Sequence, residues 1–356
     1  MSFLRRRGRD WTLAILTLPS REAYLGQLVQ SLAATVDPAR TELLILRNDG
    51  CEPVPDDARA RLEAQAGPVA VRFLRGHAEP TITRGRNALL AACRTGRIAF
   101  IDDDVTVHGD VLGSLEAALA AEPLALVGLP SLENDGDTPD KPRPDTPAVE
   151  QGPVRWMPVH GLLCAGYTAV LRHAGGFRER RRFWGEWTEL NLRLWRLGLP
   201  TGYWLGGAHL RHWTAAPDSP TRNRARKERD IVWGLLCTAL EYDAGADAPG
   251  SEAFWRLIST RYLPYAFGRG LSAERVFAVM IELLPEFGAA WHGIQADREL
   301  ARHHPFDFRP FQPLTEALVA GVRRHARRAL RRVRVVPRRR CVPAVTFPSS
   351  LSVAPA

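Results

Sequence analysis

The chain has 356 residues, of which 45% are hydrophobic and 24% charged, with a formal net charge of +9. This size and composition indicate a globular protein with a large core, and no apolar run is long enough for a membrane-spanning helix. The segment from residue 322 to 340 holds ten arginines and no acids. The rest of the chain is therefore nearly neutral, so we expect no nucleic-acid partner.

Five scattered cysteines, an odd number without a Cys-x-x-Cys pair, indicate reduced thiols and a cytoplasmic location. The first ten residues form a basic N-terminal arm. The apolar run from residue 11 to 18 follows arginines, as in a signal peptide. However, Pro19 and charged residues end it without a small-residue cleavage site, so we expect a first strand there.

Alternating patterns predict strands over 13–18, 42–46, 69–74, 97–101 and 124–129, with helices over 24–34, 84–95 and 111–121. This alternation is typical of a mostly parallel sheet with helices on both faces. Ligands of such sheets bind beyond the carboxyl ends of the strands. Polar groups that follow three of these strands should therefore meet in one cleft: Pro19-Ser20-Arg21, Asn48-Asp49-Gly50 and Asp102 to Asp104.

The composition of the second half of the chain changes from one segment to the next. Residues 131–153 are rich in Pro, Asp and Gly and predict a flexible loop, either disordered or a lid. Strand and helix patterns then return, so the first domain is expected over 11–222. A helical extension follows over 223–312, then a basic amphipathic helix over 313–340 and a disordered tail over 341–356.

Three adjacent aspartates, Asp102, Asp103 and Asp104, close the apolar strand that ends at Ile101. Strand alternation points Asp102 and Asp104 to one side and Asp103 to the other. Because adjacent carboxylates repel one another, a divalent cation with oxygen ligands is a natural partner that can also hold phosphate oxygens. The alternative is a solvated acidic turn at the strand end.

Four further motifs flank the aspartates in a fixed order: Thr83-Arg84-Gly85-Arg86-Asn87, Gly175-Gly176-Phe177, Glu186-Trp187-Thr188-Glu189 and His209-Leu210-Arg211-His212. In this order and spacing they resemble family 2 glycosyltransferases over roughly residues 11 to 215. The resemblance implies an α/β GT-A-like fold, a mostly parallel sheet flanked by helices, here with a helical C-terminal extension.

The resemblance also implies a metal-dependent inverting glycosyltransferase of hexosyltransferase type. It would move a sugar from a UDP- or dTDP-type nucleotide sugar to a hydroxyl of a glycan, a lipid-linked glycan or a small molecule, with Mg²⁺ or Mn²⁺ supporting the departing diphosphate. Metal ligands would be Asp102, Asp104 and His212. Donor contacts would come from Pro19, Arg21, Asp49, Arg86, Asn87, Asp102 and Asp103, and acceptor contacts from Trp187 and Gly161.

Several of these residues have plain structural alternatives. Asp49 could be a turn residue, Arg21 a surface side chain and His212 a packed ring. Arg86 could contact the diphosphate through its planar guanidinium, or it could form an internal ion pair with the aspartates.

Trp187 stands where the family usually has the aspartate that deprotonates the acceptor, and an indole cannot take a proton. Glu186 precedes the helix and is the expected base. Glu189 is the second candidate, although it could instead serve the helix dipole. Trp187 could stack on a sugar or lie in the core. Because of this departure from the family pattern, an alternative is that the chain is a catalytically weakened protein that binds a nucleotide sugar.

A rival interpretation uses the same aspartates. Asp102, Asp104 and Thr106 also fit the nucleophile motif of haloacid-dehalogenase-type phosphatases. That family carries the motif on its first strand and needs a later lysine. Only Lys141 and Lys227 are present, and Lys141 lies in the Pro-rich segment. We therefore expect the match to be accidental.

The basic helix near the C-terminus carries an apolar stripe opposite its arginines: Leu314, Leu318, Val322, Ala326, Leu330 and Val333. This pattern predicts peripheral docking on an anionic membrane surface, at the inner face of the membrane. The alternatives are a solvated or disordered tail and a helix packed on the body.

Overall fold

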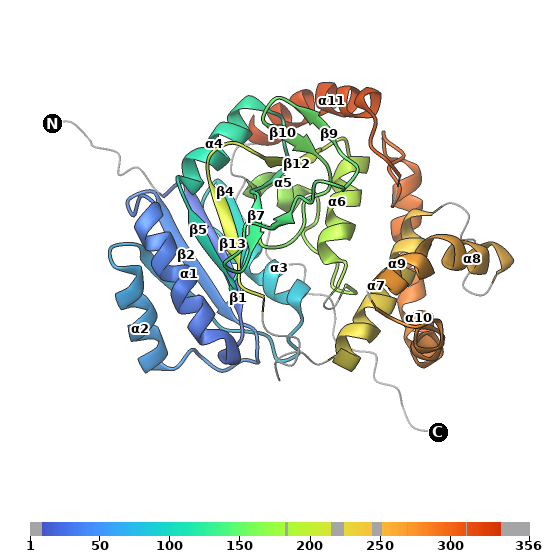
Figure 1. Cartoon of the computed structure of the whole chain (residues 1–356), viewed down its shortest axis with the longest axis horizontal. Helices are drawn as coiled ribbons and strands as arrows, with labels where there is room; N and C mark the ends of the chain where they lie inside the picture. Colours follow the sequence, from blue (N-terminus) through green and yellow to red (C-terminus); the bar gives the residue numbers. More distant parts are fainter. Residues whose placement is uncertain are drawn as a thin grey trace.

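The structure is a computed structural model that describes residues 9–181, 184–214, 224–243, 251–268, 270–310 and 312–335. A nine-stranded sheet forms its centre, a smaller four-stranded sheet lies beside it, and a group of helices stands at one side (Figure 1). Most of the expected N-terminal arm and the whole expected tail, 341–356, lie outside the described residues.

Seven of the nine strands in the large sheet share one direction, and only β11 and β10 oppose them. The predicted α/β fold with a mostly parallel sheet is therefore confirmed. The strands that form its first half are nearly continuous apolar runs, as expected where both sheet faces are covered. In spatial order the strands are β3 (Ala70–Leu74), β2 (Thr41–Arg47), β1 (Trp11–Thr17), β4 (Arg97–Asp102), β11 (Leu163–Tyr167), β6 (Leu126–Gly128), β12 (Thr201–Trp204), β10 (Val154–Trp156) and β9 (Val149–Gln151).

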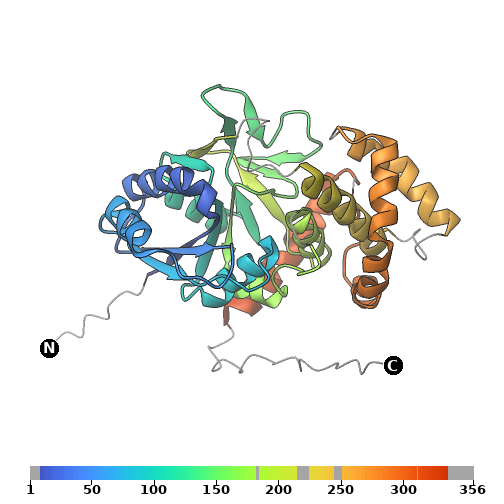
Figure 2. The ribbon, with the colours of Figure 1, turned by 90° about the horizontal axis from the view of Figure 1, so that it is seen from below.

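Helices cover both faces of this sheet because strand alternation sends neighbouring side chains to opposite sides. On β1, Leu13 and Ile15 share one core with α1 (Glu22–Thr35), α2 (Asp56–Ala66) and α4 (Val111–Ala121). Ala14 belongs to the other core, with α3 (Ile82–Ala92), α5 (Thr168–His173) and α6 (Glu186–Arg196). Figure 2 shows these helices on either side of the strands.

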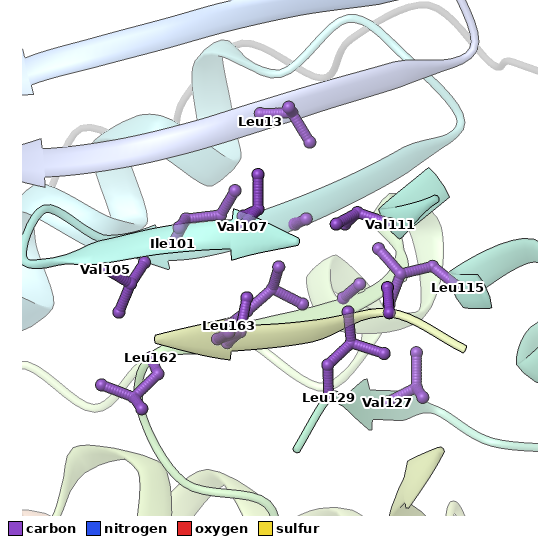
Figure 3. Close-up of a cluster of buried hydrophobic side chains, with 14 of the residues drawn as sticks. Leu13, Ile101, Val105, Val107, Val111, Leu115, Val127, Leu129, Leu162 and Leu163 are labelled. Carbon is purple, nitrogen blue, oxygen red and sulfur yellow. The ribbon is translucent and has the colours of Figure 1, made fainter. Parts of the chain in front are cut away.

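The first of these cores continues from the large sheet to the small one. Leu13 of β1 and Ile101 of β4 share it with Val105 and Val107 of β5 and with Leu115 of α4 (Figure 3). This packing fixes the turn between β4 and β5, which contains two of the three aspartates.

The small sheet has the order β5 (Val105–His108), β13 (His209–His212), β7 (Ser131–Glu133) and β8 (Pro139–Lys141). The segment 131–153, expected as a flexible loop, thus supplies β7 and β8 here and β9 to the large sheet. The expectation of a loop was wrong for these residues: β7 pairs with β8 and with the distant β13, and β9 pairs with β10. Strands of three residues are too short to show a periodic pattern in the sequence. Local composition cannot reveal such pairing.

The helical part following the first domain has its own core, which includes Ile231, Leu236 and Val279. It joins the body through buried ion pairs of Arg180 and Arg181 with Glu241. No helix within the described ranges is long and apolar enough to cross a membrane. The elements of this helical part are α7 (Arg224–Tyr242), α8 (Glu252–Leu257), a π-helical turn (Ile258–Tyr262), α9 (Leu263–Gly268) and α10 (Ala273–Arg302).

The basic helix is present as α11 (Glu316–Val335), but its apolar stripe faces the protein. Val322, Ala326 and Leu330 are buried, and Val322 belongs to one core of the body and Leu330 to the other. Arg323 binds Glu122 at 2.6 Å and lies over the ring of Trp156. The stripe is therefore not free to enter a membrane, and the packed-helix alternative is the observed one.

Candidate active site

The three aspartates lie in three different environments at the carboxyl edge of the large sheet. Their side chains are 36% exposed at Asp102, 8% at Asp103 and 16% at Asp104. The parallel register of β1 with β2 and β4 brings Thr17 and Arg47 to the same edge. The aspartates are thus not one solvated acidic turn, and only Asp102 presents much surface to solvent.

Arg86, on α3, joins two of the predicted site residues. Its guanidinium donates to Asp102 Oδ1 at 3.1 Å and to Glu186 Oε1 at 2.5 Å, and it is 4% exposed. It also lies over the ring of Trp187, 4.8 Å from the ring centre. Removing one partner of a buried ion pair lowers the free energy of unfolding by about 3–5 kcal/mol. The ion pairs of Arg86 therefore hold α3, β4 and α6 in fixed positions relative to one another.

Asp103 and Arg21 are tied to each other. Asp103 accepts from Thr17 Oγ1 and from Arg21 Nε, both at 2.7 Å. Burial raises the pKa of Asp103 to about 6, although Arg21 acts to lower it. Arg21 also binds Asp104 at 2.5 Å. Both oxygens of Asp103 are therefore used inside the protein, which differs from the expected donor contact.

Asp104 faces His212 across the pairing of β5 with β13. Asp104 Oδ2 is 3.5 Å from His212 Nε2, and the other ring nitrogen, Nδ1, is 3.0 Å from Asp140 Oδ2. Burial acts to lower the pKa of His212, but hydrogen bonds to Asp104 and Asp140 outweigh it and raise the pKa to about 9. The two residues, both expected from the sequence as metal ligands, therefore lie next to each other.

Gly161 lies between two charged groups of opposite sign. A Cβ atom on this glycine would be 3.5 Å from Asp102 Oδ2 and 3.5 Å from Lys141 Nζ. Its φ of +53° is also a conformation that favours glycine. Lys141, expected in a remote loop, therefore lies near Asp102, and no salt bridge of Lys141 is present in the described part of the chain.

Asn87 has a structural role. Its amide nitrogen donates to the Phe177 carbonyl and its oxygen accepts from the Phe177 N–H, both at 2.8 Å. A Cβ atom at Gly176 would lie 2.6 Å from the Asn87 oxygen. The Gly-Gly-Phe motif thus permits a close approach to Asn87, whose amide binds the Phe177 backbone through both polar atoms.

The other two predicted donor contacts lie at the ends of β1 and β2. Asp49 is paired with Arg47 at 2.7 Å and remains 24% exposed. Pro19 begins a short 3-10 helix (Pro19–Arg21) and lines a small pocket together with Thr17, Ile45 and Val54.

The two candidate bases lie in the first turn of α6 but have different surroundings. Glu186 is bound to Arg86 near Asp102. Glu189 is 1% exposed and bound to Arg193 and Tyr242, at 2.8 Å and 2.9 Å. Burial acts to raise its pKa, but Arg193 lowers it to about 2. Glu189 is therefore placed to stabilise the junction of α6 with α7 and not to accept a proton.

Trp187 lies in the core, which was one of its two predicted roles. It is 5% exposed and makes edge-on contacts with Phe100 and Phe177. Neither face is open for a sugar, because Arg86 covers the ring and the two phenylalanines surround it.

Three residues of the site were missed in the sequence: Thr17, Asp140 and Lys141. Thr17 is the last residue of β1 and could have been found from its position at the sheet edge. Asp140 and Lys141 carried no usable signal, because they occur among many prolines and acids in a segment without regular periodicity.

The phosphatase interpretation loses its structural basis. The aspartates follow β4, the fourth strand of the chain, and Asp102 is held by Arg86. Lys141 is close to Asp102, as that family would require, but the surrounding fold is of another type, as the comparisons below show.

The model of glycosyl transferase family 2 matches residues 14–182. No curated protein shows significant similarity to the chain. Among solved structures, GalNAc-T7 with UDP, GalNAc and Mn²⁺ aligns with a TM-score of 0.53 at 12% identity, covering 67% of this chain and 49% of that one. The chain therefore spans about half the length of this relative.

A second similar structure is S. aureus TarS 1-349 in complex with UDP-GlcNAc. Its TM-score is 0.51 at 12% identity, covering 82% of this chain and 89% of that one. Another structure of TarS 1-349 aligns with a TM-score of 0.50 at 14% identity and covers 91% of both chains. At these identities the likeness shows the shared GT-A fold.

Proposed function

Because residues 14–182 match the model of glycosyl transferase family 2, we propose that the protein transfers a hexose from a UDP- or dTDP-type nucleotide sugar to an acceptor hydroxyl with inversion. The observation that carries this proposal is the edge of the sheet where Asp102 and Asp104 meet Arg86, Lys141 and His212. Such an edge offers both carboxylates and cations to a charged ligand. TarS, which has the same fold, was solved with UDP-GlcNAc, which agrees with a uridine-type donor.

Asp102, Asp104 and His212 are the residues that would hold a divalent cation together with a diphosphate. Asp104 Oδ2 faces His212 Nε2 at 3.5 Å but is also bound by Arg21 Nη2 at 2.5 Å, so Arg21 would have to turn away for Asp104 to bind the cation. Asp102 is the most exposed of the three aspartates. No group of three His, Cys, Asp or Glu side chains forms a complete metal site among the described residues. The proposed Mg²⁺ or Mn²⁺ would therefore need waters and substrate phosphate oxygens as its remaining ligands, as Mg²⁺ commonly has. When bound, the cation would stabilise the negative charge on the leaving diphosphate.

The protein's own cations complete the electrostatic environment. Lys141 lies near Asp102 without a salt bridge among the described residues, so its ammonium group is available for an anionic oxygen of the donor. Arg86 binds two carboxylates and orients Asp102. Preorganised charges of this kind lower the barrier because they need no rearrangement when charge develops.

Glu186 is the base that we propose for the acceptor hydroxyl. Arg86 binds only Oε1 of Glu186 in the described structure, so Oε2 is the atom expected to take the proton. Gly161, opposite Asp102, leaves room for the acceptor because it has no side chain. Asp49, at the end of β2, is the proposed contact of the nucleotide base.

One observation supports a second candidate, a nucleotide-sugar-binding protein without turnover. Trp187 replaces the usual base and is packed in the core. If Glu186 does not take over the role of base, the site would still bind a donor.

A screen of nucleotide sugars by thermal unfolding, with and without Mn²⁺, tests the proposal. A donor at 100 times its Kd stabilises the folded state by about 2.7 kcal/mol, which should raise Tm by several degrees. We expect a UDP- or dTDP-sugar to do so in the presence of Mn²⁺, followed by transfer to an added acceptor. Binding without transfer or hydrolysis across many acceptors would favour the second candidate, and no binding of any nucleotide sugar would contradict both.

We also propose that α11 attaches the protein to an anionic membrane through charge alone. Its exposed face carries arginines that have no salt bridge among the described residues: Arg324, Arg327, Arg328, Arg331 and Arg332. Each basic residue near an anionic surface contributes about 1 kcal/mol, and the attraction falls with salt.

Replacing these five arginines by glutamine should abolish most co-sedimentation with vesicles that contain phosphatidylserine. The matched control replaces five exposed arginines elsewhere, at 59, 61, 94, 256 and 302, and should bind like the wild type. Equal binding of the two variants, or binding that is insensitive to salt, would contradict docking through α11.

A further inference from the structure

A groove lies between α1 and the small sheet, and the function proposed above gives it no role. Its volume is about 560 Å³, a size common among pockets that hold small ligands. Figure 1 shows α1 next to β5, and the two are joined where the Val107 N–H donates to Ser31 Oγ at 3.2 Å. Among the described residues the lining has two aromatic rings, two amides and two hydroxyl groups but no charged side chain: Tyr24, Gln27, Gln30, Ser31, Thr106 and Trp213.

Helical spacing separates the two sides of α1. Leu28, Val29 and Leu32 are buried in the first core. Gln27 and Gln30, three positions apart, lie on the opposite side and are exposed. Neither amide makes a hydrogen bond within the part of the chain that the structure describes. Each therefore has two N–H donors and one oxygen acceptor free for a ligand in the groove.

The indole ring of Trp213 is held in place by the protein itself. Its backbone N–H donates to the Asp104 carbonyl at 2.8 Å, and its Nε1–H donates to Thr106 Oγ1 at 3.2 Å. The polar atom of the ring is thus paired within the protein, while the ring lines the groove and is only partly buried. A ring fixed in this way offers apolar surface to a ligand at a small cost in conformational entropy.

Tyr24 connects the groove to the neighbourhood of the aspartates. The guanidinium of Arg21, which binds Asp104, lies 5.5 Å from the centre of the Tyr24 ring. Trp213, on the other wall, is joined to the same aspartate through its backbone. The helix α6, which carries Glu186, packs on the opposite face of the large sheet from α1. The groove is therefore beside Asp104 but separate from the proposed base.

This combination of groups selects an uncharged sugar. Aromatic rings contact the C–H surfaces of a sugar ring, and amides form hydrogen bonds with its hydroxyl groups. A charged ligand would leave water without finding an opposite charge in the lining. A wholly apolar ligand would cover the amides of Gln27 and Gln30 and leave them without partners.

We propose that the groove between α1 and β5 binds a neutral sugar unit through Tyr24, Trp213, Gln27 and Gln30. In the proposed transfer it would hold a unit of a glycan acceptor that does not itself react, so the acceptor would be an oligosaccharide. This second step rests on the proposed function, whereas the binding of a sugar does not.

Binding is tested with uncharged tetrasaccharides of glucose, mannose and N-acetylglucosamine, in the absence of any donor. Nitrogen-15 spectra report on the Nε1–H of Trp213 and on the side-chain amides of Gln27 and Gln30. We expect at least one of these sugars to shift the three groups of signals in a saturable way. The Nε1–H of Trp255, a tryptophan of α8 that is 41% exposed, should not respond.

Gln27→Ala combined with Gln30→Ala removes the amides without disturbing the core, because both side chains are exposed. The affinity for the sugar should fall by about 10-fold, as expected for the loss of two hydrogen bonds. The matched control combines Gln295→Ala with Gln312→Ala, two exposed glutamines elsewhere, and should bind like the wild type. Trp213→Ala should weaken binding at least as much as the loss of the amides.

The contrary outcomes are distinct. No saturable shift with any of the tetrasaccharides would overturn the proposal, and so would equal affinity of the wild type and the variant without Gln27 and Gln30. A shift caused by uridine and by none of the sugars would assign the groove to a nucleoside. Each of these results leaves the transferase proposal intact. If the protein binds the sugar but transfers none from any nucleotide sugar, the groove keeps its ligand and only its role for an acceptor is overturned.

Discussion

Replacing Glu186 by glutamine is expected to lower turnover by at least about 100-fold, the effect of losing a general base. The amide keeps an oxygen that can accept from Arg86, so the contact that holds α3 against α6 should survive. The amide cannot take a proton from the acceptor. Donor binding should therefore persist while the chemical step fails, and this is measured as a fall in kcat at constant donor affinity.

Glu179→Gln is the matched control for this experiment. Glu179 is also bound to an arginine of α3, Arg84, at 3.1 Å, but it lies at the surface with 57% of its side chain exposed. Loss of an exposed ion pair changes stability by about 1 kcal/mol or less, so activity should be normal. If Glu186→Gln keeps its activity, Glu186 is not the base.

Much of the fold could be predicted from the sequence because it depends on local patterns. The apolar runs of β1, β2 and β4 and the periodicity of α4 are strong signals, and α4 begins and ends as expected at Val111 and Ala121. The aspartates are also a recognisable signal in the sequence, because charge directly after a buried strand is unusual.

The roles of individual residues depended on distant contacts and could not be predicted. Asn87 belongs to a recognisable motif, yet its amide is used by Phe177, 90 positions away. Glu186 and Glu189 look equivalent in the sequence, but the helical turn between them directs one toward Arg86 and the other into an ion pair with Arg193.

The basic helix illustrates the same limit. Its stripe is equally suited to a membrane and to a protein core, because both bury apolar side chains. Which of the two the stripe contacts depends on the rest of the protein, where Glu122 and Trp156 bind Arg323.

The second large effect is expected at Asp104. Asp104→Asn should remove the Mn²⁺ dependence of donor binding, because an amide oxygen without charge replaces the carboxylate that faces His212. The melting temperature with donor should then be the same with and without Mn²⁺, whereas in the wild type the cation should add several degrees.

The neighbouring Asp103 provides the sharpest contrast. It precedes Asp104 in the same turn, and Arg21 binds both carboxylates, but Asp103 has both of its oxygens bound, one to Thr17 and one to Arg21. Asp103→Asn should therefore keep the response to Mn²⁺. A loss of this response in Asp103→Asn, with Asp104→Asn behaving like the wild type, would exchange the roles of the two carboxylates. If the donor response to Mn²⁺ persisted in both variants, the cation would have to bind elsewhere, and the proposed site beside His212 would be wrong.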